Sequence, residues 1–349
     1  MRRLVFAAPG KLTTPTGGYV YDRRIVRGLR ASGWQVKTLD LGDGFPLPGA
    51  EARATARARL AALPADQPIV VDGLALGALP EAAAELGASH CLIGLVHHPL
   101  ALETGLSLRD AAALRVSEGQ ALACVRRVIV TSANTARLIV ADYDVPAERV
   151  SIVRPGADRA APARASDEAA IALLAVGAVV ARKGYDVLLA SLATLVDLSW
   201  RLVIVGDLGR DAQAVARLRS DIVRFDLADR VRVAGVVSAK RLSSFYASAD
   251  VFVLASRFEG YGMAFSEAIA HGLPVVGSAA GAIPEAAPAG AALLAPPDDA
   301  GAFAAAVRRL IENPAERRRL GAAARAAAAA LPTWDESATL FALAIEAAM

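Results

Sequence analysis

Cysteine is scarce in this sequence, which has only Cys91 and Cys124 among its 349 residues. Both cysteines stand in apolar stretches, so we expect them to be buried free thiols. The cysteine and histidine spacings of structural zinc sites are also missing. The sequence therefore gives no sign of a zinc site.

An excess of charge of one sign is missing as well. The chain has 38 Lys and Arg residues against 35 Asp and Glu residues, which leaves a net charge of +3. Surfaces that bind nucleic acid need a clear basic excess. This balance argues against a nucleic acid as partner.

Long apolar runs are absent too. The first run extends only from Leu4 to Ala8, which is shorter than the ~7–15 residues of a signal-peptide core. No uncharged apolar run reaches the ~18 residues that indicate a membrane-spanning helix. We therefore expect a cytoplasmic protein.

What the sequence does contain is a repeated alternation of short apolar runs with longer helical patterns. This alternation is typical of βαβ units and a parallel sheet. The expected strands are Leu4–Ala7, Gln35–Leu39, Ile69–Asp72, Cys91–Val96, Arg127–Thr131, Val150–Val153, Ile171–Val176, Arg201–Val205, Val231–Ala234, Val251–Leu254, Pro274–Gly277 and Ala291–Leu294. Helices are expected between them, for example over Tyr19–Ser32, Glu51–Leu63 and Leu108–Ala123.

The chain is long enough for two domains with separate cores. A stretch rich in Pro, Gly and Ala, Arg154–Ser166, interrupts both periodicities. We expect one Rossmann-like domain over residues 1–160, a second over 161–334, and a last helix over 335–349 that can pack back on the first domain. Ligands of parallel sheets bind beyond the carboxyl ends of the strands, so two facing sheets predict a cleft between the domains.

In the first half, two motifs follow expected strands. Gly17 and Gly18 precede a helix, where an anion could approach backbone N–H groups; a plain turn is the alternative. His97-His98-Pro99 follows the fourth strand, and one histidine can donate a proton or a hydrogen bond there; a purely structural histidine is the alternative. The G-x-G-x-x-G fingerprint is absent, which argues against a nicotinamide dehydrogenase.

In the second half, Arg182 and Lys183 stand just before a helix that starts near Tyr185. Cations are unusual beside a positive helix end, so a polyanionic ligand between them would explain the pair; a solvated surface pair is the alternative. Glu259 and Glu267 frame a glycine-containing loop and could hold sugar hydroxyls and a ribose diol. Glu267 could instead be a buried or capping carboxylate, and Glu285 is an open candidate.

Glu259 and Glu267, separated by seven residues, resemble the E-x7-E motif of retaining GT-B glycosyltransferases of family 4, the glycosyl transferases group 1. The resemblance covers nearly the whole chain and is stronger in the second half. It also rests on Val176-Gly177, Arg182-Lys183-Gly184, Gly260-Tyr261-Gly262 and Gly272-Leu273-Pro274, with Gly17-Gly18 and His97-His98-Pro99 in the first half. Tyr261 and Met263 depart from the residues that many relatives have there.

This resemblance implies a GT-B fold, in which two Rossmann-like parallel-sheet domains face each other across a cleft. It implies a nucleotide-diphosphate sugar as co-substrate, retention of anomeric configuration, and neither metal nor cofactor. The implied roles are diphosphate binding by Arg182 and Lys183, ribose binding by Glu267, sugar contacts by Glu259 and His97, and backbone contacts by Gly17, Gly18, Tyr261, Gly262, Met263 and Ala264.

Several alternatives stay open at this point. The same fold also serves nucleotide-sugar epimerases and phosphorylases, and a non-catalytic homologue could simply bind a small molecule. Arginine alternates with apolar residues over 22–30 and 51–63, so peripheral contact with the inner face of a membrane is a further hypothesis. The donor base and sugar, the acceptor, the oligomeric state, and the choice between His97 and His98 are not determined by the sequence.

Overall fold

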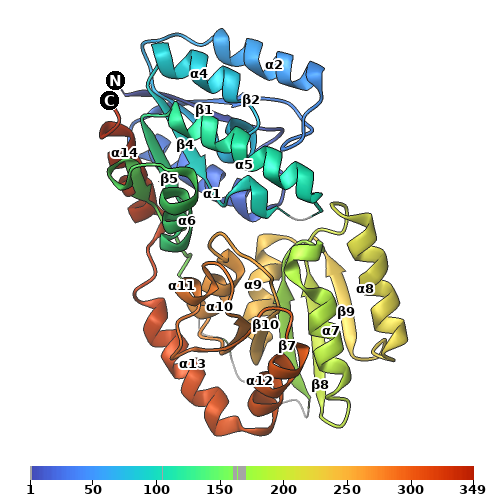
Figure 1. The fold of residues 1–349 in the computed structure, drawn as a ribbon. Coiled ribbons are helices and arrows are strands. Elements are labelled where there is room, and N and C mark those ends of the chain that lie inside the picture. Colours follow the sequence, from blue (N-terminus) through green and yellow to red (C-terminus); the bar gives the residue numbers. More distant parts are fainter. Residues whose placement is uncertain (1, 104, 160–162, 164–169) are drawn as a thin grey trace. The chain divides into compact units, whose positions relative to one another are not determined.

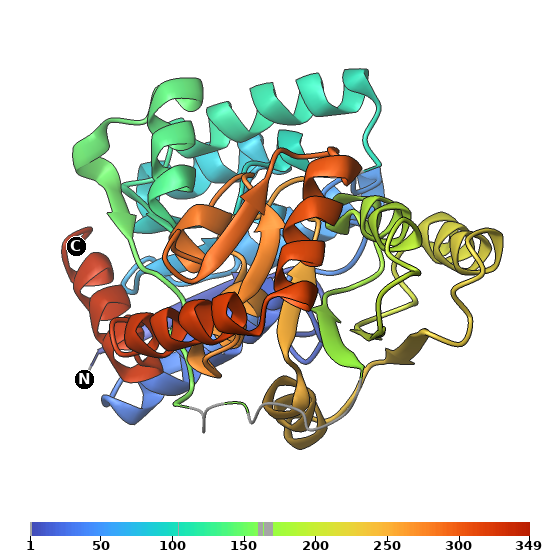
Figure 2. The same ribbon diagram turned by 90° about the horizontal axis from the view of Figure 1, so that it is seen from below.

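The computed structural model describes residues 2–103, 105–159, 163 and 170–349, and it divides into two compact units (Figures 1 and 2). The first unit comprises Met1–Gly156 together with Pro332–Met349, and the second comprises Ala157–Leu331. Part of the linker expected over Arg154–Ser166, namely residues 160–162 and 164–166, lies outside the described residues.

The first unit is built on a six-stranded sheet in the order β2-β1-β3-β4-β5-β6, and all of its strands are parallel. The strands are β1 (Arg3–Ala8), β2 (Gln35–Asp40), β3 (Ile69–Asp72), β4 (Leu92–Val96), β5 (Arg127–Val130) and β6 (Val150–Ile152). The helices are α1 (Gly17–Ala31), α2 (Ala50–Ala61), α3 (Gly73–Leu76), α4 (Pro80–Ser89), η1 (Leu100–Leu102), α5 (Leu108–Ala123), α6 (Ala133–Tyr143), η2 (Ala147–Arg149) and α14 (Trp334–Glu346).

Helices cover both faces of this sheet. Successive side chains of a strand point to opposite faces, and in β1 Val5 and Ala7 join the core formed with α2, α4 and α5. Phe6, between them, lies against Phe341 of α14 at 6.5 Å between ring centroids. The strands β1, β3 and β4 in the middle of the sheet are therefore buried on both faces, which explains why they read as continuous apolar runs.

The last helix of the chain, α14, belongs to the first unit. Thr333 caps it in a capping box with Glu336, and Ser337 donates a hydrogen bond to the carbonyl of Arg154 at 2.8 Å. It packs against α1 so closely that a Cβ on Gly28 would overlap Ala338. The helix expected over 335–349 thus begins at Trp334 and lies on the first sheet.

The second unit has its own six-stranded parallel sheet in the order β12-β11-β10-β7-β8-β9. Its strands are β7 (Ile171–Val176), β8 (Trp200–Val205), β9 (Val231–Gly235), β10 (Val251–Leu254), β11 (Val275–Ser278) and β12 (Ala292–Ala295). Its helices are η3 (Ala181–Lys183), α7 (Tyr185–Ala193), α8 (Ala212–Arg224), α9 (Ala239–Ser248), α10 (Met263–Ala270), α11 (Ile283–Ala286), α12 (Ala300–Glu312) and α13 (Pro314–Ala328).

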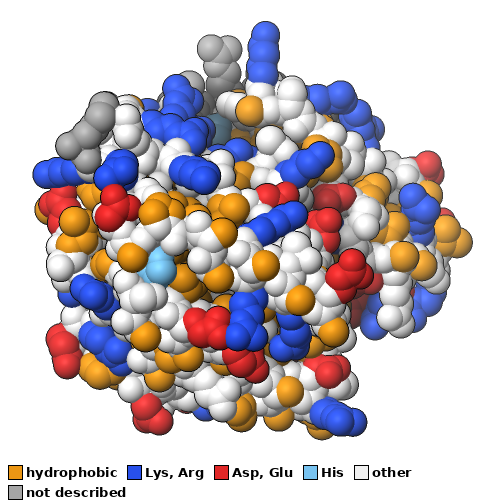
Figure 3. All heavy atoms as spheres, turned by 90° about the horizontal axis from the view of Figure 1, so that it is seen from above, with side chains coloured by type: hydrophobic (Ala, Val, Ile, Leu, Met, Phe, Trp, Pro, Cys, Tyr) orange, Lys and Arg blue, Asp and Glu red, His pale blue; other side chains and the backbone are white. Residues whose placement is uncertain are grey.

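Each strand expected from the sequence is present, with ends that differ by at most one residue from the expected ones. No helix among the described residues combines the length and apolarity needed to cross a bilayer. Basic and acidic side chains are interspersed over the face drawn in Figure 3, as the near-balanced composition suggests.

Candidate functional site

The carboxyl ends of the first sheet bring three elements together around His97. This residue directly follows β4, and its Nε2 atom lies 3.1 Å from Oδ1 of Asp22 on α1. The same Nε2 atom lies 3.3 Å from Oδ2 of Asp72 at the end of β3. The ring of Tyr21 meets the imidazole edge-on at 5.3 Å between centroids. We call Asp22, Asp72 and His97 the histidine cluster.

Burial and charge set the protonation of the histidine cluster. Burial would lower the pKa of His97, but the negative charges and hydrogen bonds of Asp22 and Asp72 outweigh it and raise the pKa to about 10. Burial raises the pKa of Asp22 to about 6, although His97 acts to lower it. At neutral pH this pair is therefore an ion pair inside the first unit.

His97 and His98 have different surroundings. An ideal Cβ on Gly18 would lie 3.4 Å from the Cδ2 atom of His97, so the backbone at the start of α1 lies beside the His97 ring. The Nε2 atom of His98 instead lies 2.9 Å from Glu103. The structure thus brings His97, and not His98, together with the paired glycines.

Neither of the paired glycines is required by the fold of the first unit. An ideal Cβ on Gly17 would meet no heavy atom within 4 Å, and on Gly18 it would make only ordinary contact with His97. Thr16 caps α1 by accepting a hydrogen bond from the N–H of Tyr19. The missing side chains leave the N-terminal end of a 15-residue helix open to a ligand.

In the second unit, Arg182 and Lys183 converge on one carboxylate. Lys183 Nζ lies 2.6 Å from Oε1 of Glu259, and Arg182 Nη1 lies 3.3 Å from Oε2. Ser256 also donates a hydrogen bond to Oε1 at 2.7 Å. We call Arg182, Lys183 and Glu259 the cationic cluster. The side chains of its two cations are only 16% and 14% exposed, so they are not a solvated surface pair.

The charge of Glu259 is fixed by its two partners. Burial would raise the pKa of Glu259, but the positive charges of Lys183 and Arg182 outweigh it and hold the pKa below the usual value. The carboxylate is therefore ionised at neutral pH, and the cationic cluster carries one net positive charge.

Glycines shape the backbone around the cationic cluster. Gly184 has φ +63° and ends η3, and a Cβ there would overlap the carbonyl oxygen of Ala255. A Cβ on Gly177 would lie 3.1 Å from Cε of Lys183, so this glycine leaves room for the lysine stem. These two positions hold the turn with both cations close to the loop with Glu259.

The loop after Glu259 leads into α10, whose first residues are the expected backbone contacts. Gly262 has φ +94°, a conformation that favours glycine, and Met263 begins the helix. Tyr261 is buried, whereas Met263 and Ala264 are half-buried. Farther along α10, Glu267 accepts a hydrogen bond from the hydroxyl of Tyr246 at 2.9 Å. Glu267 is thus half-buried and held by a tyrosine, rather than capping its helix.

Comparison with known proteins identifies the second unit first. The family model described as Glycosyl transferases group 1 matches residues 157–327, which include the cationic cluster and α10. The chain belongs to this family. A D-inositol 3-phosphate glycosyltransferase of Streptomyces scabiei is 31% identical over 226 residues, which are 58% of this chain and 51% of that protein. The match therefore spans about half the length of this curated relative.

Solved structures of similar fold extend over both units of this group 1 family member. Sucrose-phosphate synthase from Thermosynechococcus elongatus has a TM-score of 0.84 at 22% identity, and the match covers 99% of each chain. Anabaena HepE, solved with UDP and glucose, has a TM-score of 0.79 at 18% identity and covers 99% of this chain and 100% of its own. The GT-B fold class and the family resemblance are confirmed.

The sequence did not predict three residues, two of them in the histidine cluster and one beside Glu267. Asp22 interrupts the buried face of α1, which also carries Tyr21 and Ile25, and a lone acid on an apolar helix face was the available signal. Asp72 was assigned only as the end of a strand. Tyr246 has no sequence signal of its own, because its contact with Glu267 joins residues 21 positions apart.

The histidine cluster also has the spacing of a cation site, since one ligand atom from each residue lies within 4.8 Å of the others. However, Nε2 of His97 already lies within hydrogen-bond distance of both carboxylates. We therefore assign the positive charge of this cluster to the imidazole ring.

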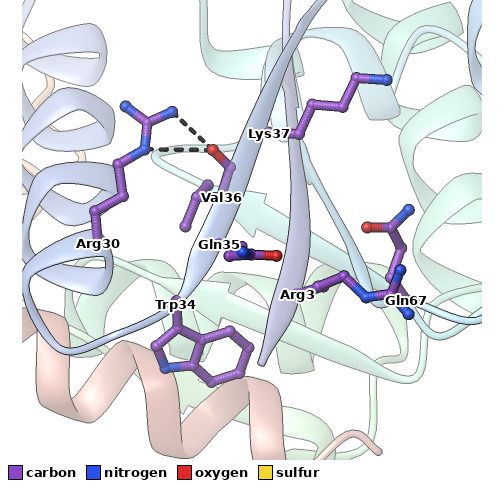
Figure 4. Close-up of a pocket in the computed structure, with 7 residues that line it drawn as sticks. All are labelled: Arg3, Arg30, Trp34, Gln35, Val36, Lys37 and Gln67. Atoms are coloured by element: carbon purple, nitrogen blue, oxygen red, sulfur yellow. Dashed lines mark hydrogen bonds between the residues drawn. The ribbon is translucent and has the colours of Figure 1, made fainter. Parts of the chain in front are cut away.

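A shallow cavity of about 370 Å³ lies at the opposite, amino end of the first sheet (Figure 4). Its arginines are already engaged, because Arg30 donates to the carbonyl of Val36 and Arg3 pairs with Asp66. Figure 4 shows Arg30 and Lys37 on opposite sides of β2 rather than converging. This cavity is not a candidate for the donor site.

Proposed function

We propose that this chain is a retaining glycosyltransferase that moves a sugar from a nucleotide-diphosphate sugar to an acceptor. The observation that carries the proposal is the convergence of Arg182 and Lys183 on Glu259, next to the helix that bears Glu267. Two half-buried cations beside a helix N-terminus suit a diphosphate. From the first unit, Gly17, Gly18 and His97 are proposed as further contacts of the donor.

The chemistry follows from the charges of the cationic cluster. The bond between the anomeric carbon and the diphosphate oxygen breaks, and the negative charge that develops on the leaving diphosphate is stabilised by Arg182 and Lys183. Lys183 is paired with Glu259 before the donor binds. On binding, the diphosphate replaces Glu259 as the ion-pair partner of Lys183. Glu259 is then available to accept hydrogen bonds from sugar hydroxyls.

Retention requires the acceptor oxygen to attack the face from which the diphosphate leaves. The acceptor hydroxyl loses its proton to the departing phosphate oxygen, and its oxygen bonds to the anomeric carbon. Glu267 would bind the two ribose hydroxyls, with Tyr246 fixing its orientation. The backbone N–H groups at residues 261–264 would contact the sugar and the phosphates.

Two other functions use the same site. A nucleotide-sugar epimerase would convert the donor without an acceptor, and a binding homologue would not convert it at all. HepE, of similar fold, was solved with UDP and glucose, which makes UDP and UDP-glucose the first ligands to test. The acceptor is open, although the Streptomyces relative is named for D-inositol 3-phosphate.

A thermal-shift screen with UDP, GDP and ADP tests the proposal. We expect a rise in melting temperature with one nucleotide, because a ligand that binds only the folded state stabilises it. The rise should disappear in Lys183→Ala and persist in Lys240→Ala, which removes an exposed lysine of the same unit. Donor turnover is then measured with and without an acceptor. Turnover that requires the acceptor indicates transfer, and turnover without it indicates epimerisation. A melting temperature that none of the three nucleotides raises contradicts the proposal.

A cytoplasmic location with peripheral membrane contact is a separate part of the proposal. The large apolar residues of α1 are buried in the first unit, among them Ile25, Val26 and Leu29. Contact with a membrane would therefore rely on the exposed arginines of this helix and on anionic lipid. Sedimentation with vesicles of phosphatidylserine and phosphatidylcholine tests it, and a protein that stays in the supernatant disproves it.

A further inference from the structure

The histidine cluster contains more negative charge than a neutral histidine could balance. Asp22 is 0% and Asp72 is 2% exposed, and both carboxylates lie against the same Nε2 atom of His97. Oδ2 of Asp22 is buried without a hydrogen-bond partner among the described residues. Two buried carboxylates without a compensating charge would cost several kcal/mol. A ring protonated on both nitrogens supplies one positive charge against these two carboxylates and so reduces that cost.

Each carboxylate is held in place by its own element. Asp72 accepts a hydrogen bond from the N–H of Leu74 through Oδ1 at 2.8 Å, so its other oxygen is directed to His97. Asp22 is fixed by α1, on the turn that follows Gly18. Thr131 donates a hydrogen bond to the carbonyl of His97 at 3.2 Å, which fixes the backbone that carries the ring.

We propose that Asp22 and Asp72 are positioning residues that keep the His97 ring doubly protonated, so that it acts as a fixed cation and hydrogen-bond donor throughout turnover. The ring then cannot accept the proton of the acceptor hydroxyl. This inference rests on the proposed function, and it assigns the role of base to the departing diphosphate alone.

The other groups around the ring do not supply or remove this charge. Burial raises the pKa of Tyr21 well above its usual value, and this phenol is neutral. Arg23 lies one residue beyond Asp22 on α1 and favours its ionised form. The neighbouring His98 has its own partner in Glu103. Between about pH 6 and about pH 10, Asp22 and His97 both stay ionised.

NMR of the histidine rings tests the charge without any substrate. The chain has four histidines, so the spectrum is simple and His97→Gln assigns the signal. We expect the His97 ring in the wild-type protein to keep its charged chemical shifts to at least pH 8.5. Asp22→Asn should move its midpoint down by more than one pH unit. Glu103→Gln is the matched control, because it changes the carboxylate beside His98 and should leave the His97 signal unmoved.

Asp72→Asn is the second variant in case Asp22→Asn does not fold, since an amide oxygen can still accept the hydrogen bond from Leu74. It should also lower the His97 midpoint. A wild-type ring that titrates between pH 6 and 7 overturns the inference. One equivalent of a divalent metal in the purified protein, lost in Asp22→Asn, overturns it as well, because the cluster would then be a metal site.

The pH dependence of donor hydrolysis, assayed with UDP-glucose, supplies the functional arm. The wild-type kcat/KM should be flat from pH 6.5 to 8.5, whereas in Asp22→Asn it should fall towards the upper end of this range as the ring loses its proton. A wild-type profile that falls in the same way contradicts a fixed cation. If UDP-glucose is not turned over at all, the proposed function is at fault, and the NMR titration still decides the charge of His97.

Discussion

The pKa values of acidic side chains are shifted in opposite directions in the two units. In the first unit, burial dominates and raises the pKa of Asp22 to about 6 and of Glu118 to about 7. In the second unit, Arg and Lys partners dominate and lower the pKa of Glu259 and of Asp186. The difference comes from the partners of these acids. In the second unit they are guanidinium and ammonium groups, which keep a positive charge at all relevant pH values, whereas in the first unit they are an imidazole and a tyrosine.

This contrast gives the two units opposite pH dependence. A raised carboxyl pKa contributes stability below the unfolded value near pH 4, and that stability is lost as the pH rises through 6 to 7. A lowered carboxyl pKa contributes stability above the unfolded value, and it is lost as the pH falls below about 4. The cationic cluster therefore keeps its charge over the whole neutral range, whereas the first unit changes near neutrality.

The largest expected effect on donor turnover comes from removing one cation of the cationic cluster. Lys183→Ala should reduce donor turnover by about ten- to hundredfold, because a charge-assisted contact is worth about 1.5–3 kcal/mol. Stability should also fall, since Glu259 loses its 2.6 Å partner while buried. Steady-state kinetics and chemical denaturation measure the two effects.

The double variant Lys183→Ala/Glu259→Gln separates these effects. It replaces the buried carboxylate that has lost its lysine partner with a neutral amide, and it should recover stability without recovering turnover. Lys240→Ala is the control for loss of a lysine as such. Near-wild-type turnover in Lys183→Ala would rule out the assignment of the diphosphate site.

Glu118 offers the sharpest test of the first unit. It is 1% exposed on α5, and burial raises its pKa to about 7 even though the N–H of Leu100 donates a hydrogen bond to it. Glu118→Gln should match the wild type in stability near pH 5 and exceed it by about 3 kcal/mol at pH 8.5, at 1.36 kcal/mol for each pKa unit. Thermal unfolding at the two pH values measures this. A constant difference between the two proteins would show that Glu118 is not neutral in the folded state.

Glu267 and Tyr246 test the other half of the second-unit site with a smaller effect. Glu267→Ala should cost about tenfold in kcat/KM, equivalent to one lost contact of about 1.4 kcal/mol. Tyr246→Phe removes the hydroxyl that lies 2.9 Å from the Glu267 carboxylate and 3.2 Å from the Ala264 carbonyl, and it should cost a few-fold in kcat/KM. The kinetics of both variants with the selected donor measure this order. A Tyr246→Phe variant more impaired than Glu267→Ala would mean that the tyrosine acts in some other way.

The fold was predictable from sequence because parallel strands leave a simple signal. Ile69–Asp72, Ile171–Val176 and Val251–Leu254 are apolar runs between helical patterns, and the structure has strands over these same residues. The family motif likewise pointed to residues around Glu259 through local spacing. Periodicity and spacing are local properties of the chain, and they were sufficient to predict the strands and to recognise the family motif.

The side-chain partners could not be predicted in the same way. The contact of His97 with Asp22 joins residues 75 positions apart, and that of Lys183 with Glu259 joins residues 76 apart. Such pairs depend on which strands become neighbours and on side-chain rotamers at their ends. The roles of the site residues stay predictions until the variants are measured.

The smallest expected effect concerns the start of α1. An ideal Cβ on Gly17 would meet no atom of the described residues within 4 Å, so Gly17→Ala should leave the free energy of unfolding unchanged within about 0.5 kcal/mol, as for other surface changes. If the diphosphate approaches this backbone, the added methyl group should still raise the KM for the donor by a few-fold. Ala50→Gly, at the first position of α2, is the control for exchanging these residues at a helix start. An unchanged KM in Gly17→Ala would separate the first unit from donor binding and leave the second-unit cluster as the whole diphosphate site.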